Sequence, residues 1–430
     1  MKKTILLLLI LSFASCSYFT KKLDSISEIK NSNETISNVD KINFCKENSV
    51  TEIIIDDTKS LNFYKNFYQS LNQNHNFNFV QKAILLSLLE MSKRPDLSSP
   101  YARLQVYMIF QGKEYYFDFR PKNLEDSDKM PYLFGLNELN NKFTESSFSE
   151  FISTADNLLT TNLPVGSEWE DFLHKNEKDF LKNSILTKHF FKGDEILTKF
   201  ETFKRVNLKN VYQYYIKQKQ NISKDYLSKG ADLYQYNSQE EKLTISCNFD
   251  FQTESTTIND YIDVDYKKSH YFGIKEGENA FIATSSAVTH RPFKTQNELG
   301  YLFKTRASPY PLPACNFKSP NKNITLISNS GRSPQQHLQH LIAFEIEKID
   351  NISGVNEFLK FSRHLFLARP DRILYESKKG RKSQLDFFLS MNFPLYHVES
   401  LGNIFGHAKL HKSSHLIIDS RSDAGLWCKK

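Results

Sequence analysis

The densest group of acid–base side chains in this chain lies near its C-terminus, where His407, Lys409, His411 and His415 are followed by Asp419. The histidines stand four residues apart, a spacing that would stack them on one face of a helix and allow metal binding. However, a glycine precedes the segment, an apolar run follows it, and no acidic residue lies between the histidines. This pattern indicates a loop that leads into a strand, so we predict no metal site and no bound cofactor.

The triplet His407-Ala408-Lys409 resembles the His-x-Lys core of the phospholipase D superfamily. The resemblance implies a phosphodiesterase or phosphotransferase in which His407 attacks phosphorus and Lys409 steadies the negative charge. The sequence departs from the family pattern, because the spacer from Lys409 to Asp419 is longer and the chain has no second His-x-Lys. A member of the family needs two such motifs at one site, so the second would come from a dimer partner or from a diverged half.

Two junctions in the same region form a candidate anion site. Each leaves a predicted strand, carries a Gly-Arg pair and ends on a serine suited to cap the following helix. Helix N-termini present free backbone N–H groups and a partial positive charge, which neighbouring basic side chains strengthen. The residues expected to hold a phosphate, sulfate or carboxylate group are Arg332, Ser333, Lys379, Arg381 and Ser383.

The beginning of the chain has the layout of an export signal. A short basic start precedes an apolar run that is too short to span a bilayer, and Phe13-Ala14-Ser15 leads into Cys16. Small residues before a cysteine resemble the lipobox of bacterial lipoproteins, although Phe13 stands where leucine is usual. The resemblance implies that residues 1–15 are a signal peptide and that the sulfur of Cys16 is lipidated. We therefore expect an exported protein, anchored to the bacterial cell envelope at the outer rather than the inner membrane.

Four cysteines remain once Cys16 is lipidated, and an exported chain meets oxidising conditions that favour disulfides. Three pairings are possible. We prefer Cys247 with Cys315, because each lies in a Cys-Asn-Phe triplet within a predicted strand. The second bridge would then join Cys45 to Cys428 and tie the two ends of the chain together.

Composition and pattern predict an α+β protein. With 430 residues, 40% of them apolar, the chain can form two or three cores, and its charge of +7 is too diffuse for a nucleic-acid partner to be expected. We expect a flexible tether over residues 16–43 and a mainly helical domain with one β-hairpin over 44–232. Residues 233–430 would form antiparallel strands leading into a small three-layer α/β unit, because strands alternate with helices there and this indicates parallel pairing.

These patterns together favour a membrane-anchored envelope lipoprotein that binds an anionic ligand or a protein partner, without a defined catalytic activity. One alternative is the phosphodiesterase or phosphotransferase with His407 and Lys409 at its centre. A second alternative is a purely structural envelope lipoprotein, for which the sequence offers no distinguishing feature. These alternatives differ in whether His407 and Lys409 share a pocket with the two Gly-Arg junctions.

Overall fold

The structure is a computed structural model. It describes residues 44–45, 49–74, 76–121, 129–219, 234–237, 243–249, 269–288, 303, 306–308, 311–329, 334–343, 346–360, 362–367, 372–376, 382–390, 394–398, 400–419 and 421–429. Cys16, the tether and the strand expected near residues 261–266 lie outside these ranges. Among the described residues, no helix combines the length and the apolar character that crossing a membrane requires.

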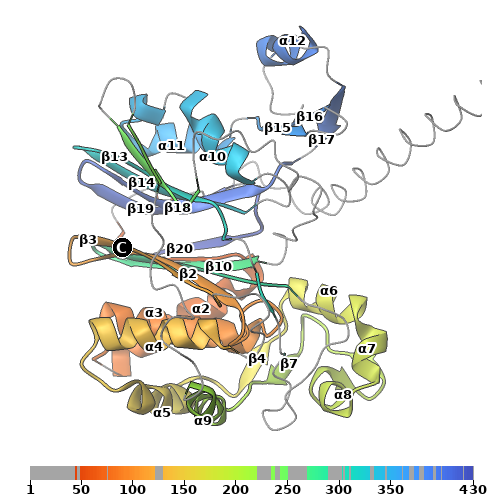
Figure 1. The fold of residues 1–430 in the computed structure, drawn as a ribbon. Coiled ribbons are helices and arrows are strands. Elements are labelled where there is room, and N and C mark those ends of the chain that lie inside the picture. The colour runs from red at the N-terminus through yellow and green to blue at the C-terminus, as the bar shows by residue number, and fades with distance from the viewer. Residues whose placement is uncertain are drawn as a thin grey trace, which may run out of the picture.

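Two antiparallel sheets stack face to face at the centre of the molecule (Figure 1). The strands of the first sheet are β1 (Thr51–Ile55), β2 (Arg103–Phe110), β3 (Lys113–Phe119), β10 (Ser269–Glu276), β11 (Asn279–Val288), β12 (Arg306–Ala307) and β20 (Gly425–Lys429). Those of the second are β8 (Tyr234–Asn237), β9 (Thr244–Cys247), β13 (Ala314–Ser319), β14 (Lys322–Asn329), β18 (Asn403–Leu410) and β19 (Ser413–Ile418). The orders are β20-β1-β10-β11-β2-β3, with β12 beside β11, and β19-β18-β14-β13-β9-β8. The first sheet therefore joins strands from both ends of the chain.

Helices cover the outer face of each sheet, so the molecule has four layers (Figure 1). The helices on the side of the first sheet are η1 (Thr58–Ser60), α2 (Leu61–Asn74), α3 (Phe79–Lys93), α4 (Pro131–Phe143), α5 (Phe148–Leu158), α6 (Ser167–Lys175), α7 (Glu177–Leu181), α8 (Ser184–Phe190) and α9 (Leu208–Lys219). Those on the side of the second sheet are α10 (Pro334–Ala343), η5 (Ile346–Lys348) and α11 (Ile352–Lys360). Helix α12 (Lys382–Ser390) stands apart from the layers.

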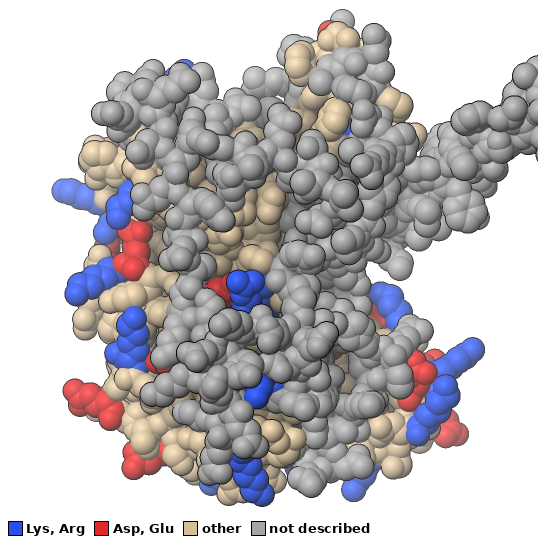
Figure 2. Space-filling view, viewed as in Figure 1, with Lys and Arg blue, Asp and Glu red and all other residues tan. Residues whose placement is uncertain are grey.

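Three small sheets complete the described structure. Their strands are β15 (His364–Leu367), β16 (Arg372–Glu376) and β17 (Leu395–Val398) in one, β4 (Asn162–Pro164) with β7 (Thr202–Lys204) in another, and β5 (Phe191–Lys192) with β6 (Glu195–Ile196) in the last. Figure 2 shows basic and acidic side chains interspersed over the visible described surface. The described part of this face therefore carries its charge in mixed sign.

The apolar pattern of the strands determines which face each residue covers. Along β10, Tyr271 faces the second sheet, whereas Phe272 and Ile274 pack with the helices on the outer side. The ring of Tyr271 stacks on that of Phe405 in β18, with centroids 3.7 Å apart. This contact bridges the two sheets at the middle of the core.

Local sequence signals explain where several elements begin and end. Helix α3 starts with a capping box, in which the side chains of Asn78 and Gln81 each accept a hydrogen bond from the other residue's backbone N–H. The turn from β2 to β3 places Gln111 and Gly112 at positive φ, as a tight hairpin requires. His411 adopts a φ of 53° in the turn from β18 to β19. The histidine-rich segment is therefore a hairpin, which corrects the loop expected from the sequence.

The α+β class and the hairpin of β2 and β3 are confirmed. The heavily apolar run from Phe79 to Met91 predicts a buried helix, and α3 confirms it. The expected parallel arrangement of the last strands is found only between β16 and β17 among the described strands. Strand β14 instead pairs antiparallel with both β13 and β18. The sequence analysis expected the strand that contains Cys315, which is β13, but it missed β18; these two strands are the antiparallel partners of β14.

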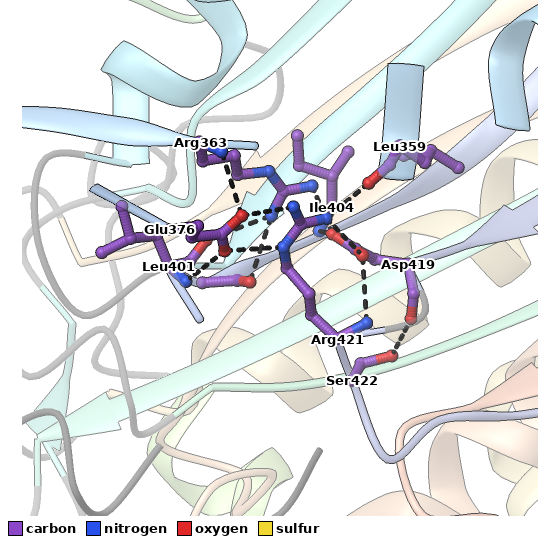
Figure 3. A network of polar contacts seen from close by, with 9 residues as sticks. Leu359, Arg363, Glu376, Leu401, Ile404, Asp419, Arg421 and Ser422 are labelled. Carbon is purple, nitrogen blue, oxygen red and sulfur yellow. Dashed lines mark hydrogen bonds and ion pairs between the residues drawn. The ribbon is translucent and has the colours of Figure 1, made fainter. Parts of the chain in front are cut away.

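A buried network of four charged side chains joins the small sheet of β15–β17 to the sandwich (Figure 3). Arg421 lies between Glu376, at the end of β16, and Asp419, which follows β19; its Nε donates to Glu376 at 2.7 Å. Arg363, just before β15, pairs with Asp419. All four side chains are at most 7% exposed. Two cations and two anions balance there, which offsets the cost of removing them from water.

Backbone N–H groups also donate hydrogen bonds to the carboxylates of Glu376 and Asp419. Glu376 accepts from the N–H of Leu401 at 2.7 Å and from that of Arg363 at 3.0 Å. Asp419 accepts from the N–H of Ile404 at 3.1 Å. The network thereby fixes the start of β18 relative to β16.

We expect Glu376→Gln to lower the free energy of unfolding by about 3–5 kcal/mol, because it leaves the buried Arg421 with one fewer counter-ion. Urea unfolding at neutral pH measures this loss. The matched control is Glu278→Gln, which removes a surface carboxylate that pairs with Lys409 and is 62% exposed, and should cost less than about 1 kcal/mol. Equal losses in the two variants would contradict the role given to the network.

Candidate active site

Ser269 is the first residue of β10, the strand between β1 and β11 in the first sheet. Its hydroxyl donates a hydrogen bond of 2.8 Å to the side-chain oxygen of Asn329, the last residue of β14 in the second sheet. Ser269 is 5% exposed. A buried hydroxyl group thus lies at the end of a central strand, at the point where the two sheets meet.

The register of the first sheet places further polar residues in the same row. Ser286 of β11 stands opposite Ser269, and Arg103 of β2 stands opposite Ser286. The hydroxyl of Ser286 is buried and has no hydrogen-bond partner among the described residues. Arg103 forms a buried ion pair with Asp118, and its guanidinium donates to the carbonyl oxygen of Ser308 at 3.2 Å. The row combines two neighbouring hydroxyl groups with a fixed cation.

His270, the next residue, lies on the other face of β10 between two carboxylates. Its Nδ1 is 2.6 Å from Asp56, which follows β1, and its Nε2 contacts Glu90 of α3. Burial favours the neutral ring, but the charges of Asp56 and Glu90 outweigh it and raise the pKa of His270 to about 10. His270 is therefore a cation at neutral pH.

The pKa of Glu90 shifts in the opposite direction. Burial alone would raise the pKa of Glu90, but the positive charge of His270 lowers it below the ordinary value. Glu90 is fully buried in α3 and belongs to the same helix as Lys93, which pairs with Asp57 at 3.5 Å. A protonated His270 flanked by ionised carboxylates has no lone pair to offer, so it cannot act as a general base at neutral pH.

The structure places His407 far from this site. His407 lies in β18 and is fully buried, and its Nε2 is 2.9 Å from the hydroxyl of Ser414. Burial, with the charges of Lys275, His415 and Lys409, lowers the pKa of His407 to about 3. His407 stands opposite Thr325, which is four residues along β14 from Asn329, or about 13 Å. It is therefore a neutral residue in the middle of β18, outside the site at Ser269.

Lys409 does not act with His407 on a common pocket. Its ammonium group pairs with Glu278 at the surface, where the two side chains are 44% and 62% exposed. His415, from the same histidine segment, binds Glu52 at 3.1 Å inside the protein. The predicted His-x-Lys site is thus divided between the interior and the surface.

The remaining predicted residues have different outcomes. Both disulfides, Cys45–Cys428 and Cys247–Cys315, are confirmed. Lipidation at Cys16 stays a prediction, because that residue lies outside the described ranges. Of the expected anion site, Arg332, Ser333, Lys379 and Arg381 lie outside the described residues, and Ser383 is described only as part of the backbone of α12. Where the structure describes the chain, no three His, Cys, Asp or Glu residues gather as metal ligands would.

The sequence analysis missed Ser269, His270, Asp56, Glu90 and Asn329. The short alternating run from His270 to Ile274 does predict a strand, and the pair Ser-His at its start is the one local signal the sequence offers. Nothing local indicates that a carboxylate some two hundred residues earlier lies against this histidine. The partners come together only through the pairing of β1 with β10 and the packing of α3 below them.

The fold along almost the whole chain is similar to those of several solved structures. A cephalosporin acylase from Bacillus halodurans matches with a TM-score of 0.59 and 8% identity, covering 92% of this chain and 99% of the other. Two structures of LmbA2991 match with TM-scores of 0.60 and 0.62 at 6% identity, covering 90% and 91% of this chain and all of the other. These neighbours have N-terminal-nucleophile (Ntn) hydrolase-like folds. No protein-family model and no curated protein sequence matches the chain.

This likeness overturns the function expected from the sequence. The expectation of a protein that only binds a ligand or serves a structural role is wrong, and so is the alternative of a phospholipase D-like enzyme. Export and the lipid anchor stay predictions. The physical reason for the second error is that both side chains of the motif are engaged inside the fold rather than presented by a loop. His407 and Lys409 point to the same face of β18, but His407 is fully buried against Ser414 and Lys409 pairs with Glu278 at the surface.

We expect the free energy of unfolding to fall as pH rises from about 6.5 towards about 10, because the unfolded chain then releases the proton that folded His270 retains. The slope would be at most about 1.4 kcal/mol per pH unit. In contrast, stability due to ionised Glu90 is present above its unfolded pKa and is lost on acidification. Urea unfolding of wild type and His270→Asn between pH 6 and 10 measures the histidine contribution.

The difference between the two proteins isolates His270 from other groups that titrate in this range, such as Glu276, whose pKa is raised to about 7 by burial. NMR titration of the His270 ring in the wild type provides a second readout that does not require the variant to fold. A midpoint near 6.5 would show that the ring is not held as a cation.

Proposed function

We propose that this protein is an amide hydrolase of the N-terminal-nucleophile type, in which Ser269 becomes the nucleophile after the chain is cut between Lys268 and Ser269. The observation that carries the proposal is the position of Ser269, a buried serine at the start of the central strand where the two sheets meet. The similarity in fold to an acylase supports amide chemistry rather than phosphate chemistry.

The hydroxyl of a nucleophilic serine must give its proton to a base. The groups beside Ser269 leave the α-amine of Ser269 itself as that base. His270 holds its proton to a pKa of about 10, and its two neighbouring carboxylates are engaged with it. The hydroxyl donates to Asn329, whose amide oxygen is a weak base. A free α-amino group on Ser269 would have a pKa of about 7.7–8.0 and would be a suitable proton acceptor near neutral pH. Release of that amine requires the chain to be cut directly before Ser269.

The cut can be performed by the serine itself. The hydroxyl oxygen attacks the carbonyl carbon of Lys268, the bond from that carbon to the nitrogen of Ser269 breaks, and the nitrogen takes up the hydroxyl proton. Water then hydrolyses the resulting ester, which yields the carboxylate of Lys268 and regenerates the hydroxyl. Ser269 is left with a free amine, and the atoms of one water molecule are consumed.

Substrate hydrolysis repeats the same steps on an external amide. The α-amine accepts the hydroxyl proton as the oxygen attacks the substrate carbonyl, and the proton passes to the departing amine. Water releases the acyl group from the ester. The carboxamide nitrogen of Asn329 lies on the same planar group as the oxygen that holds Ser269, so it is a donor available to the oxyanion.

We expect wild-type protein to yield a fragment whose N-terminal sequence is Ser-His-Tyr-Phe, and Ser269→Ala to remain uncut and inactive on amides. N-terminal sequencing and mass spectrometry of the purified protein measure the cut. Release of p-nitroaniline from N-acyl anilides with neutral and carboxylate-bearing acyl groups measures activity.

The matched control is Ser87→Ala, which removes a fully buried hydroxyl that only caps a carbonyl within α3. It should be cut and should be as active as wild type. Wild-type protein that stays intact would overturn the proposal. Cutting of Ser269→Ala at the same bond would show that an external protease, not this serine, performs the cut.

We further expect Asn329→Ala to reduce both the rate of cutting and the kcat for anilide hydrolysis by about 10²–10³, as loss of an oxyanion donor does in other hydrolases. Asn316→Ala is the control, because Asn316 lies in β13 of the same sheet and bonds only to neighbouring side chains, at 2.6 Å and 2.8 Å. An unchanged kcat in Asn329→Ala would remove this residue from the mechanism.

A further inference from the structure

Both disulfides cross the point at which Ser269 begins its strand. Cys45 and Cys247 precede Ser269 in the sequence, whereas their partners, Cys428 and Cys315, follow it. A cut before Ser269 divides the chain into a first segment that ends at Lys268 and a second segment that starts at Ser269. Each bridge then has one cysteine in each segment.

We infer that the mature protein is a two-chain molecule whose segments are held together covalently by these two bridges. This inference rests on the proposed function, because it requires the cut before Ser269. It concerns the same site, because the site is itself divided between the segments. Asp56 and Glu90 belong to the first, and Ser269, His270 and Asn329 belong to the second. The site is complete only while the segments stay associated.

Each sheet contains strands from both segments, so the segments meet where neighbouring strands pair. In the first sheet, β1 of the first segment lies between β10 and β20 of the second. In the second sheet, β8 and β9 of the first segment are added to the outer side of β13. Strand β20 is therefore an edge strand held by β1, and β9 is held to the rest of its sheet by β13.

Each bridge fastens one of these two contacts. Cys428 lies in β20, opposite Glu52 of β1, and binds Cys45, which lies just before β1. Cys247 of β9 stands directly opposite Cys315 of β13. The bridges thus lie where a peripheral strand of one segment pairs with a strand of the other. A covalent link keeps such segments at an effective concentration of about millimolar, whatever the concentration of the protein.

Electrophoresis in denaturing detergent, with and without reductant, tests the inference on the full chain. We expect cut wild-type protein to run as one species without reductant and as two species with it. Ser269→Ala should run as one species in both conditions. Two species from wild type without reductant would overturn the inference, because neither bridge would then join the segments.

Cysteine variants test whether each of the two disulfides joins the segments. Removing one bridge, by Cys45→Ala with Cys428→Ala or by Cys247→Ala with Cys315→Ala, should leave one species without reductant. Removing all four cysteines should give two. A single bridge-pair variant that already separates would show that the other bridge does not join the segments.

Failure of the cut and failure of the link can be distinguished. If wild type shows one species even with reductant, the proposed function fails. The bridges are then tested in a chain with a recognition sequence for a specific protease inserted between Lys268 and Ser269. After digestion, one species without reductant and two with it would support the covalent link, and two species in both conditions would refute it.

The link should also affect stability. For the cut wild type, the thermal midpoint should not change when the protein is diluted about a hundredfold, because the segments cannot separate. The four-alanine variant, or wild type held in reductant, should show a midpoint that falls on dilution, as expected of a dissociating pair. A midpoint independent of concentration in the reduced protein would show that strand pairing alone holds the segments.

Discussion

The rest of the structure depends on the pairing of β1 on both of its edges. All of its residues are buried, and its backbone bonds to β10 on one side and to β20 on the other. Without β1, two strands from the C-terminal part of the chain would each expose a row of unpaired N–H and C=O groups in the interior, at a high cost in free energy. The strand also positions charge at both ends of the sandwich, because Glu52 lies within it and Asp56 follows it.

In the described part of the chain, the buried charges around His270 and around Arg421 have partners that offset the loss of hydration. The clearest comparison is between His270 and His407, which are both fully buried and lie in the two facing sheets. Burial disfavours the charged form of both rings. At His270 two carboxylates outweigh it and raise the pKa, whereas at His407 burial lowers the pKa and cationic neighbours lower it further. Neighbouring charge, rather than burial, decides which ring is a cation. This distinction removes both histidines from general-base catalysis at neutral pH, for opposite reasons.

The residues around Ser269 and His270 come from distant parts of the chain that the two sheets bring together. Ser269 and His270 are consecutive in the sequence, yet they face opposite sides of β10 and take partners from different layers. Asn329 approaches from the second sheet, Asp56 from the turn after β1, and Glu90 from α3. A cut at the start of β10 would free an amine without separating these partners, since strand pairing and the two bridges lie elsewhere. The fold can therefore accept a chain break at the site that the proposed chemistry requires.

The sequence by itself determined the α+β class, the buried helix α3 and the hairpin of β2 and β3, and it favoured, among three possible pairings, the two disulfides that the structure contains. The helix and the hairpin follow from local periodicity and turn residues. The preferred disulfide pairing follows from the Cys-Asn-Phe triplet that Cys247 and Cys315 share. Only the tertiary structure decided that β14 and β18 are antiparallel neighbours, and that His407 is fully buried while the ammonium group of Lys409 reaches the surface. It alone placed Asp56 and Glu90 against His270. The reason is that pairing between distant strands is set by how all the apolar faces can be buried at once, which no local stretch of sequence records.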